Sequence, residues 1–255
     1  MNIDTDSASS FQLPPEVLEI CELAEGIVSK ELMPLEAQFL TSSDHAFGIK
    51  ETLNLQAVFG QETLDYLMKI AKDTGLWTLM IPEEFGGAGL SMLSKVAILE
   101  RFYYTAVPFP FANVPNILYD CKGAQIEKYL NPVMSGAKTT CFVQTEPNAG
   151  SDPGGMMQTK AVKDGDDWII NGTKMWISMA AESDVMMVQV VTDAGKRQRG
   201  GITMFLVDRN NPGVKVEEPG IKTWLGPRAS QYIVHFDDCR VSKDDILGEV
   251  GNGFR

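Results

Sequence analysis

The sequence contains few of the residues from which metal sites and histidine-based catalytic centres are built. It has two histidines, His45 and His235, and four cysteines that are widely separated and form no Cys-x-x-Cys pair. This spacing offers neither a zinc cluster nor a disulfide framework. We therefore expect no metal site, no disulfide and no histidine-based triad. His235 lies in an alternating run, Tyr232 to Phe236, and is interpreted as one side of a strand.

Positive charge is also scarce. The 255 residues include 22 Lys and Arg against 34 Asp and Glu, which gives a formal net charge of -12 and an isoelectric point near 4.6. The basic run at 196–199 is short and is interpreted as a solvated loop tip. Because binding to phosphate backbones needs clustered Lys and Arg, the composition argues against nucleic acid or an anionic membrane as the main partner.

Long hydrophobic runs are missing as well. No window approaches eighteen uninterrupted apolar residues, and the N-terminus has no basic segment followed by an apolar one. The sequence therefore predicts a soluble, cytoplasmic protein. At 44% hydrophobic residues, the chain is long enough for one large domain or two smaller ones, each with its own core.

Two helices are predicted early in the chain after a loose terminus over residues 1–12. The first opens at Pro14-Pro15, where proline suits a first turn, and is ended or kinked at Pro34. The second starts near Gln61 and stops at Gly75, a C-terminal cap. Apolar residues at three- and four-residue steps form their buried stripes: Leu18, Cys21, Ala24, Val28 and Leu32 in the first, and Leu64, Leu67 and Ala71 in the second.

A third helix is predicted to start after Ser91, with an apolar stripe of Met92, Val96, Leu99 and Tyr103, and a short fourth near 126–130. The preceding segment 82–89 carries three glycines before a helix, which invites a phosphate-binding interpretation. It has neither Gly-x-Gly-x-x-Gly nor a Gly-Lys-Ser/Thr ending, so a tight connection is the simpler interpretation.

The pattern changes near residue 138, where short strands separated by turn dipeptides begin. Asp164-Gly165 and Asn171-Gly172 predict hairpins, because both pairs accept the positive φ angles of tight turns. The predicted fold class is α+β: a helical N-terminal domain over residues 1–136 and an all-β, sandwich-like or barrel-like domain over residues 137–255. The predicted strands are Thr139–Thr145, Thr159–Val162, Trp168–Ile170, Thr173–Ile177, Val185–Val191, Ile202–Val207, Val214–Glu217 and Tyr232–Phe236.

The stretch 141–178 is the candidate site, since ligands commonly bind in the crevice between two such domains. A polar loop with Gly150 leaves one strand, and glycine lets the backbone approach a phosphate closely. Trp176 and Ser178 lie two apart on a strand and so point the same way. Together they suit a planar cofactor. The alternative is that Trp176 is core and 145–147 a simple turn.

Two runs in this stretch carry a family resemblance. Thr-Glu-Pro-Asn-Ala-Gly-Ser-Asp at 145–152 and Asn-Gly-Thr-Lys-Met-Trp-Ile-Ser at 171–178 resemble the flavin-binding signature of the acyl-CoA dehydrogenases. The glycine-bearing loop at 82–89 resembles the family's first-domain loop. The segment 222–241 resembles the family too, with Lys222, Leu225-Gly226, Arg228 and Ser230 before a strand that ends Phe-Asp-Asp-Cys-Arg-Val.

The resemblance implies that FAD lies between a helical and a β domain, and it implies eight binding residues. Three would lie along the isoalloxazine edge, two would approach the cofactor pyrophosphate and the CoA moiety, and three would wall the ring, the last of them near N5. These are Phe142, Gln144 and Thr145; Gly150 and Ser151; and Trp176, Ile177 and Ser178. Ser151 is the one assigned to substrate as well.

The activity implied by the resemblance is α,β-desaturation of an acyl-CoA, as in fatty acid metabolism, with electrons passing to an electron-transfer flavoprotein. The sequence departs from the family at Val143-Gln144, where a small and an aliphatic residue are usual. Ser178 replaces a common threonine and keeps the hydroxyl, and Met179 replaces a usual asparagine. These departures leave the FAD site in place but loosen any inference about acyl specificity.

The family's catalytic glutamate lies in a C-terminal helical bundle that would follow Arg255. Glu146 is therefore not the expected base, and no catalytic residue is assigned to this chain. The sequence is expected to be a fragment of an FAD-dependent acyl-CoA dehydrogenase, and a homo- or hetero-oligomer. Three alternatives stay open: a short subunit that needs a partner, a non-catalytic acyl-CoA- or protein-binding module, and a flavin oxidase or monooxygenase of the same fold.

Overall fold

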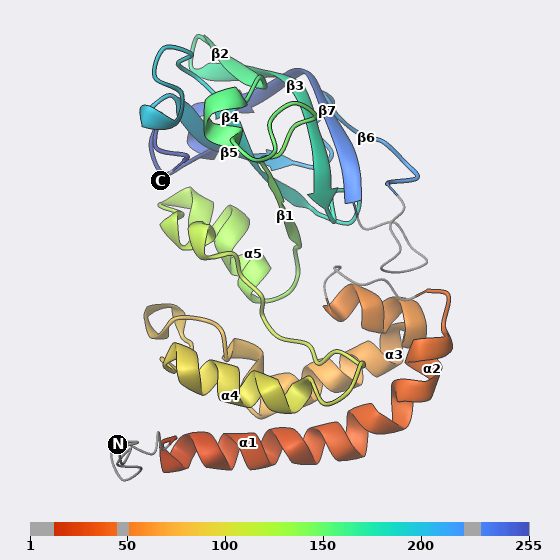
Figure 1. Ribbon diagram of the computed structural model, residues 1–255. Helices are drawn as coiled ribbons and strands as arrows, with labels where there is room; N and C mark the ends of the chain where they lie inside the picture. Colours follow the sequence, from red (N-terminus) through yellow and green to blue (C-terminus); the bar gives the residue numbers. More distant parts are fainter. Residues whose placement is uncertain (1–12, 45–50, 222–230, 255) are drawn as a thin grey trace, which may run out of the picture.

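The computed structural model describes residues 13–44, 51–221 and 231–254. A helical half and a β half lie one above the other, and the segment after α5 (Asn131–Met134) leads into β1 (Thr140–Val143) (Figure 1). The predicted loose terminus at 1–12 and the family-like positions at 222–230 lie outside the described residues. The structure therefore has the α+β organisation that the sequence predicts.

The helical half begins with α1 (Pro15–Ile27) and continues through a π-helical turn and a short 3-10 turn into α2 (Glu36–Thr41). The predicted opening at Pro15 is confirmed, with proline in the first turn. The remaining helical elements are α3 (Glu51–Asp73), α4 (Met92–Phe102), α5 and short turns at Leu76–Thr78, Glu83–Phe85, Asn116–Asp120 and Ile126–Leu130.

The second predicted helix is preceded by a helical segment that the sequence did not predict. Helical structure begins at Glu51, and Gly60, with φ 84° and ψ 176°, interrupts it. The segment after this break carries the predicted stripe of Leu64, Leu67 and Ala71, all buried. Gly75, with φ 76°, adopts the left-handed conformation expected of a residue that ends a helix.

The apolar stripe predicted for the third helix is wrong, although its start after Ser91 is confirmed by a side-chain cap on Ser94 N. Ile98 and Phe102 are buried, whereas Met92, Val96 and Tyr103 are exposed. Both faces of α4 carry apolar residues, so spacing alone does not choose between them. Packing chooses the face on which Phe102 stacks against Phe109, with a centroid distance of 4.6 Å.

The β half is an eight-stranded sheet with the order β6-β7-β3-β2-β4-β5-β8, in which β1 pairs with β4 in parallel. A single turn of helix, α6 (Pro153–Met156), follows the loop after β1. The strands after β1 are β2 (Lys160–Asp164), β3 (Asp167–Ser178), β4 (Val185–Val191), β5 (Ile202–Asp208), β6 (Val214–Val216), β7 (Gln231–Ser242) and β8 (Ile246–Leu247).

The two predicted hairpins differ in outcome. Asp164-Gly165 does turn the chain, since Asp164 pairs with Asp167 and Gly165 has φ 65°. Asn171-Gly172 is not a hairpin, because β3 runs straight through it to Ser178. A register shift against β7 accompanies Gly172, and a Cβ there would lie 2.5 Å from Thr159 Oγ1. The glycine marks a close approach of two chain segments within a sheet, not a turn.

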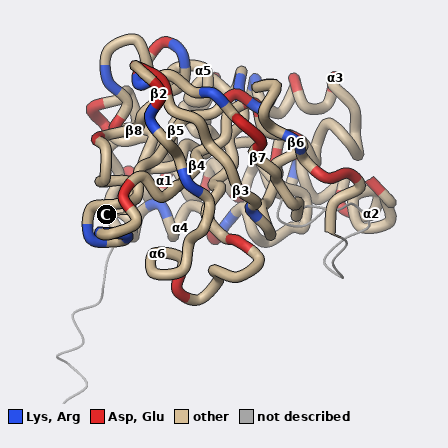
Figure 2. The backbone as a smooth tube through the Cα atoms, turned by 90° about the horizontal axis from the view of Figure 1, so that it is seen from above, with Lys and Arg blue, Asp and Glu red and all other residues tan. Residues whose placement is uncertain are grey.

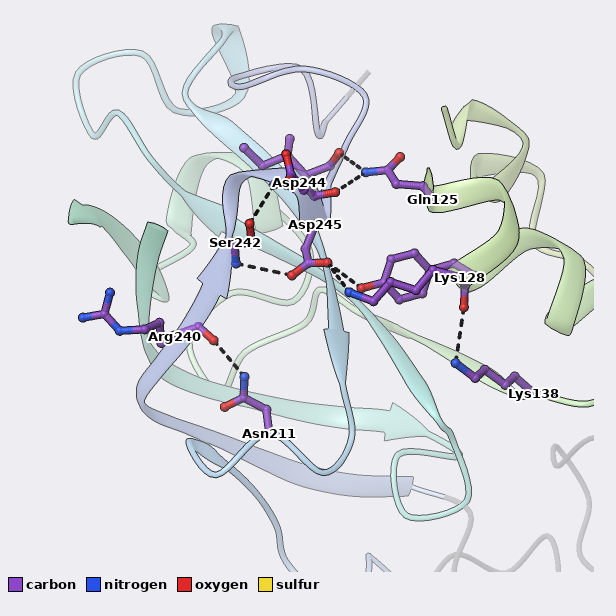
Figure 3. A network of polar contacts seen from close by, with 10 residues as sticks. Gln125, Lys128, Lys138, Asn211, Arg240, Ser242, Asp244 and Asp245 are labelled. Carbon is purple, nitrogen blue, oxygen red and sulfur yellow. Dashed lines mark hydrogen bonds and ion pairs between the residues drawn. The ribbon is translucent and has the colours of Figure 1, made fainter. Parts of the chain in front are cut away.

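Strand β4 joins the two halves because both of its faces are buried. Val185 and Met187 belong to the apolar core of the helical half, and Met186 and Val188 to the core within the sheet. Polar contacts add to this joint (Figure 3): Gln125 Nε2 donates to the backbone oxygens of Asp244 and Ile246, each at 2.8 Å. The candidate site therefore lies on a sheet that is anchored to the helices.

Charge is spread over the described chain without a basic stripe. Lys and Arg alternate with Asp and Glu around the periphery when the molecule is viewed from above (Figure 2). Across the described ranges, no helix is both long and apolar enough to cross a bilayer. The same residues contain no group of three or more His, Cys, Asp or Glu side chains placed to hold a metal ion.

Candidate flavin site

The two halves of the predicted site come together where β1 ends beside β3. Met175 N donates a hydrogen bond of 2.8 Å to Thr145 O, and Lys174 Nζ donates one of 2.9 Å to Gln144 O. The residues that leave β1 thus lie directly against the segment that leads to Trp176. Two runs separated in the sequence become one surface.

This surface carries exposed aromatic side chains. Phe142 is 43% exposed and Trp176 50% exposed. Ser178 is also exposed, and it and Trp176 flank Ile177, whose side chain is buried in the sheet core. The alternative that Trp176 is a core residue is excluded.

The backbone at Trp176 is strained. Its φ is 61° and that of Met179 is 63°, and a positive φ is a genuine outlier for a bulky residue. A register shift against β7 between Lys174 and Ile177 accompanies this conformation. Strain of this kind persists only where the surroundings enforce it, and it concentrates at ligand sites.

The side chains of three predicted residues are buried or already hydrogen-bonded within the protein. Ile177 is buried in the sheet core, so it presents no exposed side chain. Gln144 Nε2 donates to Gln189 Oε1 at 2.6 Å, and Gln189 Nε2 in turn donates to Gly253 O. Ser178 Oγ accepts from Gln231 Nε2 at 2.8 Å. The predicted wall of three side chains is therefore a wall of Trp176 and the Ser178 hydroxyl.

The loop after β1 is a tight turn followed by open backbone. Glu146 and Ala149 exchange backbone hydrogen bonds of 3.2 and 3.1 Å. A Cβ at Gly150 would meet no atom within 4 Å, so this backbone is approachable, and Ser151 beside it is exposed. Asp152 Oδ1 then caps α6 by accepting from Gly155 N at 2.9 Å. The loop can thus offer backbone and a hydroxyl to a polar group.

The residues that sequence reasoning missed lie beneath this surface. Lys174 Nζ is 3.0 Å from Glu146 Oε1, and the two side chains are 0% and 3% exposed. Glu146 also accepts hydrogen bonds from Gln158 N at 2.7 Å and Thr159 N at 3.0 Å. Both residues lie inside the two signature runs, but spacing does not show that they meet.

The ion pair perturbs both groups. Burial lowers the pKa of Lys174 to about 8, against the opposing attraction of Glu146. Burial acts to raise the pKa of Glu146, but the charge of Lys174 and the hydrogen bonds from Thr159 and Gln158 hold it below its ordinary value. Glu146 is thus a paired carboxylate with its oxygens occupied by donors, which agrees with its exclusion as a base.

The arrangement fits a flavin. A flat, largely apolar ring needs an aromatic wall and polar groups along one edge, and Phe142, Trp176 and Ser178 present both types on one surface. The open backbone at Gly150 and the exposed Ser151 suit the phosphates of such a cofactor.

His235, the histidine of the alternating run, lies in β7 as predicted. Its Nδ1 is 3.1 Å from Thr173 Oγ1, and its Nε2 is 2.6 Å from Glu217 Oε1. These contacts lie among β3, β6 and their neighbours and account for both ring nitrogens. His235 is therefore held as part of the sheet.

Comparison with known proteins finds a family match for each half of the chain. Residues 15–137 match the family described as acyl-CoA dehydrogenase, N-terminal domain, and residues 141–239 match acyl-CoA dehydrogenase, middle domain. The solved structure of a glutaryl-coenzyme A dehydrogenase glutaryl-CoA complex superposes with a TM-score of 0.71 at 26% identity. That match covers 96% of this chain and 59% of the other.

Two curated relatives are named for different reactions, one as a dehydrogenase and one as a subunit of a reductase complex. The mouse (Mus musculus) mitochondrial short-chain specific acyl-CoA dehydrogenase is 34% identical, over 88% of this chain and 56% of its own length. The caffeyl-CoA reductase-Etf complex subunit CarC of Acetobacterium woodii is 38% identical, over 77% of this chain and 52% of its own. The chain spans little more than half the length of these relatives.

Proposed function

The chain belongs to the acyl-CoA dehydrogenase family, and we propose that its residues 140–178 hold the isoalloxazine ring of FAD in an enzyme that desaturates an acyl-CoA thioester. The proposed division is a helical domain over 1–136 and a flavin-holding β domain over 137–255. The end of α5 at Met134 and the start of β1 at Thr140 support this division.

One observation carries the proposal. Trp176 is half exposed at a strained positive φ, and the hydrogen bond from Met175 N to Thr145 O brings it beside the strand end that carries Phe142. Two exposed aromatic side chains on neighbouring segments of the sheet leave apolar area in water, which costs free energy unless a ligand or partner covers it. A flavin ring would cover both.

Each residue has a part in this proposal. Trp176 walls the ring, and the Ser178 hydroxyl donates toward its polar edge. The backbone from Gln144 to Thr145 lies beside Trp176 and lines the ring edge, and Gly150 with Ser151 meets the phosphates of the cofactor and of CoA. When bound, FAD supplies the acceptor for the hydride that leaves the substrate.

Abstraction of the substrate α-proton is not assigned to Glu146. Glu146 is buried, paired with Lys174 and saturated with hydrogen-bond donors, so it cannot reach a substrate α-carbon from this position. The proposal therefore gives this chain's site residues the tasks of binding and orienting. It assigns proton abstraction to none of them.

The proposed redox partner is an electron-transfer flavoprotein, which accepts electrons from the flavin or donates electrons to it. The 38%-identical relative is named as a subunit of a reductase complex with Etf, whereas the short-chain relative is named as a dehydrogenase. A flavin at this site can serve either direction, so reduction of an enoyl-CoA is the second candidate function.

The test is a titration of the purified chain with FAD, followed through the absorbance and fluorescence of the flavin. Saturable binding of one FAD per chain supports the proposal, and its absence overturns it. Candidate acyl-CoA esters are then added to the FAD-loaded chain without oxygen. A change in the flavin spectrum without bleaching would show that substrate approaches the ring and that the residues of this site do not abstract its proton.

A further inference from the structure

The Lys174–Glu146 pair occupies the centre of the site's support. Lys174 Nζ donates to Glu146 Oε1 and to Gln144 O, at 3.0 and 2.9 Å. Glu146 in turn accepts from the backbone of Gln158 and Thr159 just before β2. Three segments that are distant in the sequence, namely the end of β1, the start of β2 and the later part of β3, thus meet at one pair of charges.

Such a pair is a costly way to hold a fold together. Removing two charges from water carries a large desolvation cost, and well-packed apolar residues often stabilise a core equally well. With side-chain exposures of 0% and 3%, both charges here are almost wholly removed from solvent. A buried ion pair is better suited to fixing one geometry, because its hydrogen bonds are directional and an alternative arrangement would leave a charge unpaired.

The geometry in question is that of the flavin wall. Thr145 precedes Glu146, and Met175 and Trp176 follow Lys174 directly. The hydrogen bond from Met175 N to Thr145 O joins the same two segments through their backbones. The pair and this backbone bond therefore both join the β1 exit to the segment in which Trp176 holds its φ of 61°.

We propose that Lys174 and Glu146 are positioning residues that hold the two adjoining segments of the flavin site, residues 144–146 and 174–176, at the mutual spacing that suits the ring. Their ion pair and the bond from Lys174 Nζ to Gln144 O lock the loop of residues 144–146 against β3. This inference rests on the proposed function, because it names FAD as the ligand whose ring sets that spacing. Neither residue touches substrate in this scheme, so neither is a catalytic residue.

The experiment compares Lys174→Met, Glu146→Gln and the double variant with the unaltered chain. Two measurements are made: hydrogen exchange of the Met175 amide in the flavin-free chain, and the dissociation constant for FAD. Lys174→Met should accelerate exchange at Met175 and weaken FAD binding, each by at least about tenfold, because it breaks both links at once. Glu146→Gln keeps the bond from Lys174 to Gln144 O and should have the smaller effect.

The double variant separates positioning from simple stability. With both charges gone, no buried charge is left unpaired, so global stability should recover toward that of the unaltered chain. FAD binding should not recover, since Gln144 O still lacks its donor. Val190→Ala, in the buried core of β4, serves as the control for general destabilisation. Measured well below its unfolding temperature, it should bind FAD as the unaltered chain does.

The outcomes are distinct. If the unaltered chain binds FAD and either Lys174→Met or the double variant binds it as tightly, the positioning role is overturned and the proposed function stands. If the double variant recovers stability but not FAD affinity, while Met175 exchange stays fast, the positioning role is supported. If the unaltered chain binds no FAD, the proposed function itself is overturned, and with it the flavin role of the pair.

Discussion

Tyr129 donates a hydrogen bond of 2.6 Å to Asp245 Oδ1, and these residues lie 116 positions apart in the two halves of the chain. Lys128 Nζ reaches the same oxygen at 2.8 Å (Figure 3), and Asp245 Oδ2 accepts from Ser242 N. Burial raises the pKa of Tyr129 well above its ordinary value, and the hydrogen bond to Asp245 adds to this. One aspartate therefore ties the helical half to the end of β7.

Removing this contact should loosen the joint. We expect Tyr129→Phe to lower the free energy of unfolding by about 1–2 kcal/mol, since Asp245 loses a buried donor while the ring stays in place. Denaturant unfolding followed by circular dichroism measures the change. Tyr104→Phe, at an exposed tyrosine, is the matched control and should change little. Equal stability of the two variants would contradict a structural role for the Tyr129 hydroxyl.

The buried lysine should produce a defined pH dependence. The pKa of Lys174 is about 8 in the folded protein, below its ordinary value of 10.5. Between these values the unfolded chain holds a proton that the folded chain has released, so this group makes the free energy of unfolding rise with pH. The difference in stability between the unaltered chain and Lys174→Met should therefore shift in favour of the unaltered chain from about pH 8 to 10.5. If the free energies of unfolding of the two proteins changed in parallel with pH across this window, the predicted role of Lys174 would be contradicted.

Gly172 should tolerate no side chain. Its φ is 150°, and a Cβ would lie 2.5 Å from Thr159 Oγ1 and 2.6 Å from Thr159 Cα. We expect Gly172→Ala to destabilise the protein by about 2–4 kcal/mol, from backbone strain and overpacking together. Gly165→Ala is the control, since it adds strain at φ 65° but meets no atom within 4 Å. Thermal unfolding of both variants decides the matter, and a smaller loss for Gly172→Ala than for Gly165→Ala would contradict the close-approach argument.

Trp176→Ala should weaken FAD binding by about 1–3 kcal/mol, through loss of an aromatic wall. Stability should change little, because half of the side chain is already exposed. Flavin titration measures the affinity, and Tyr104→Ala provides an exposed aromatic control away from the β sheet. Unchanged flavin occupancy in Trp176→Ala would count directly against the proposed site.

The exposed face of α4 should make the chain associate. Met92, Leu93 and Val96 are exposed on this helix, and Tyr103 and Tyr104 follow it. Exposed apolar side chains gathered on one helix favour association with another surface. Light scattering at increasing concentration should show self-association, and Met92→Lys with Val96→Glu should reduce it. Val162→Thr, at an exposed strand position, is the control. A strictly monomeric unaltered chain at high concentration would contradict the prediction.

Local signals predicted much of the fold because they depend on neighbours in the chain. The proline at the start of α1, the Ser91 cap of α4 and the Asp164-Gly165 turn each act within a few residues. The failures involve distant partners. Asn171-Gly172 has the composition of a hairpin, but the pairing of Asn171 with β2 and of Gly172 with β7 keeps it inside β3. The buried face of α4 was likewise decided by Phe109, from a following segment.

The candidate site divides in the same way. The amino-acid sequence by itself determined the two signature runs and their family, because both are properties of short runs of residues. Only the tertiary structure decided that the Ile177 side chain faces the core, and that Lys174 and Glu146 form one buried pair. Those outcomes depend on which strands become neighbours, and that choice is made by burial over the whole sheet, not by any short run of residues.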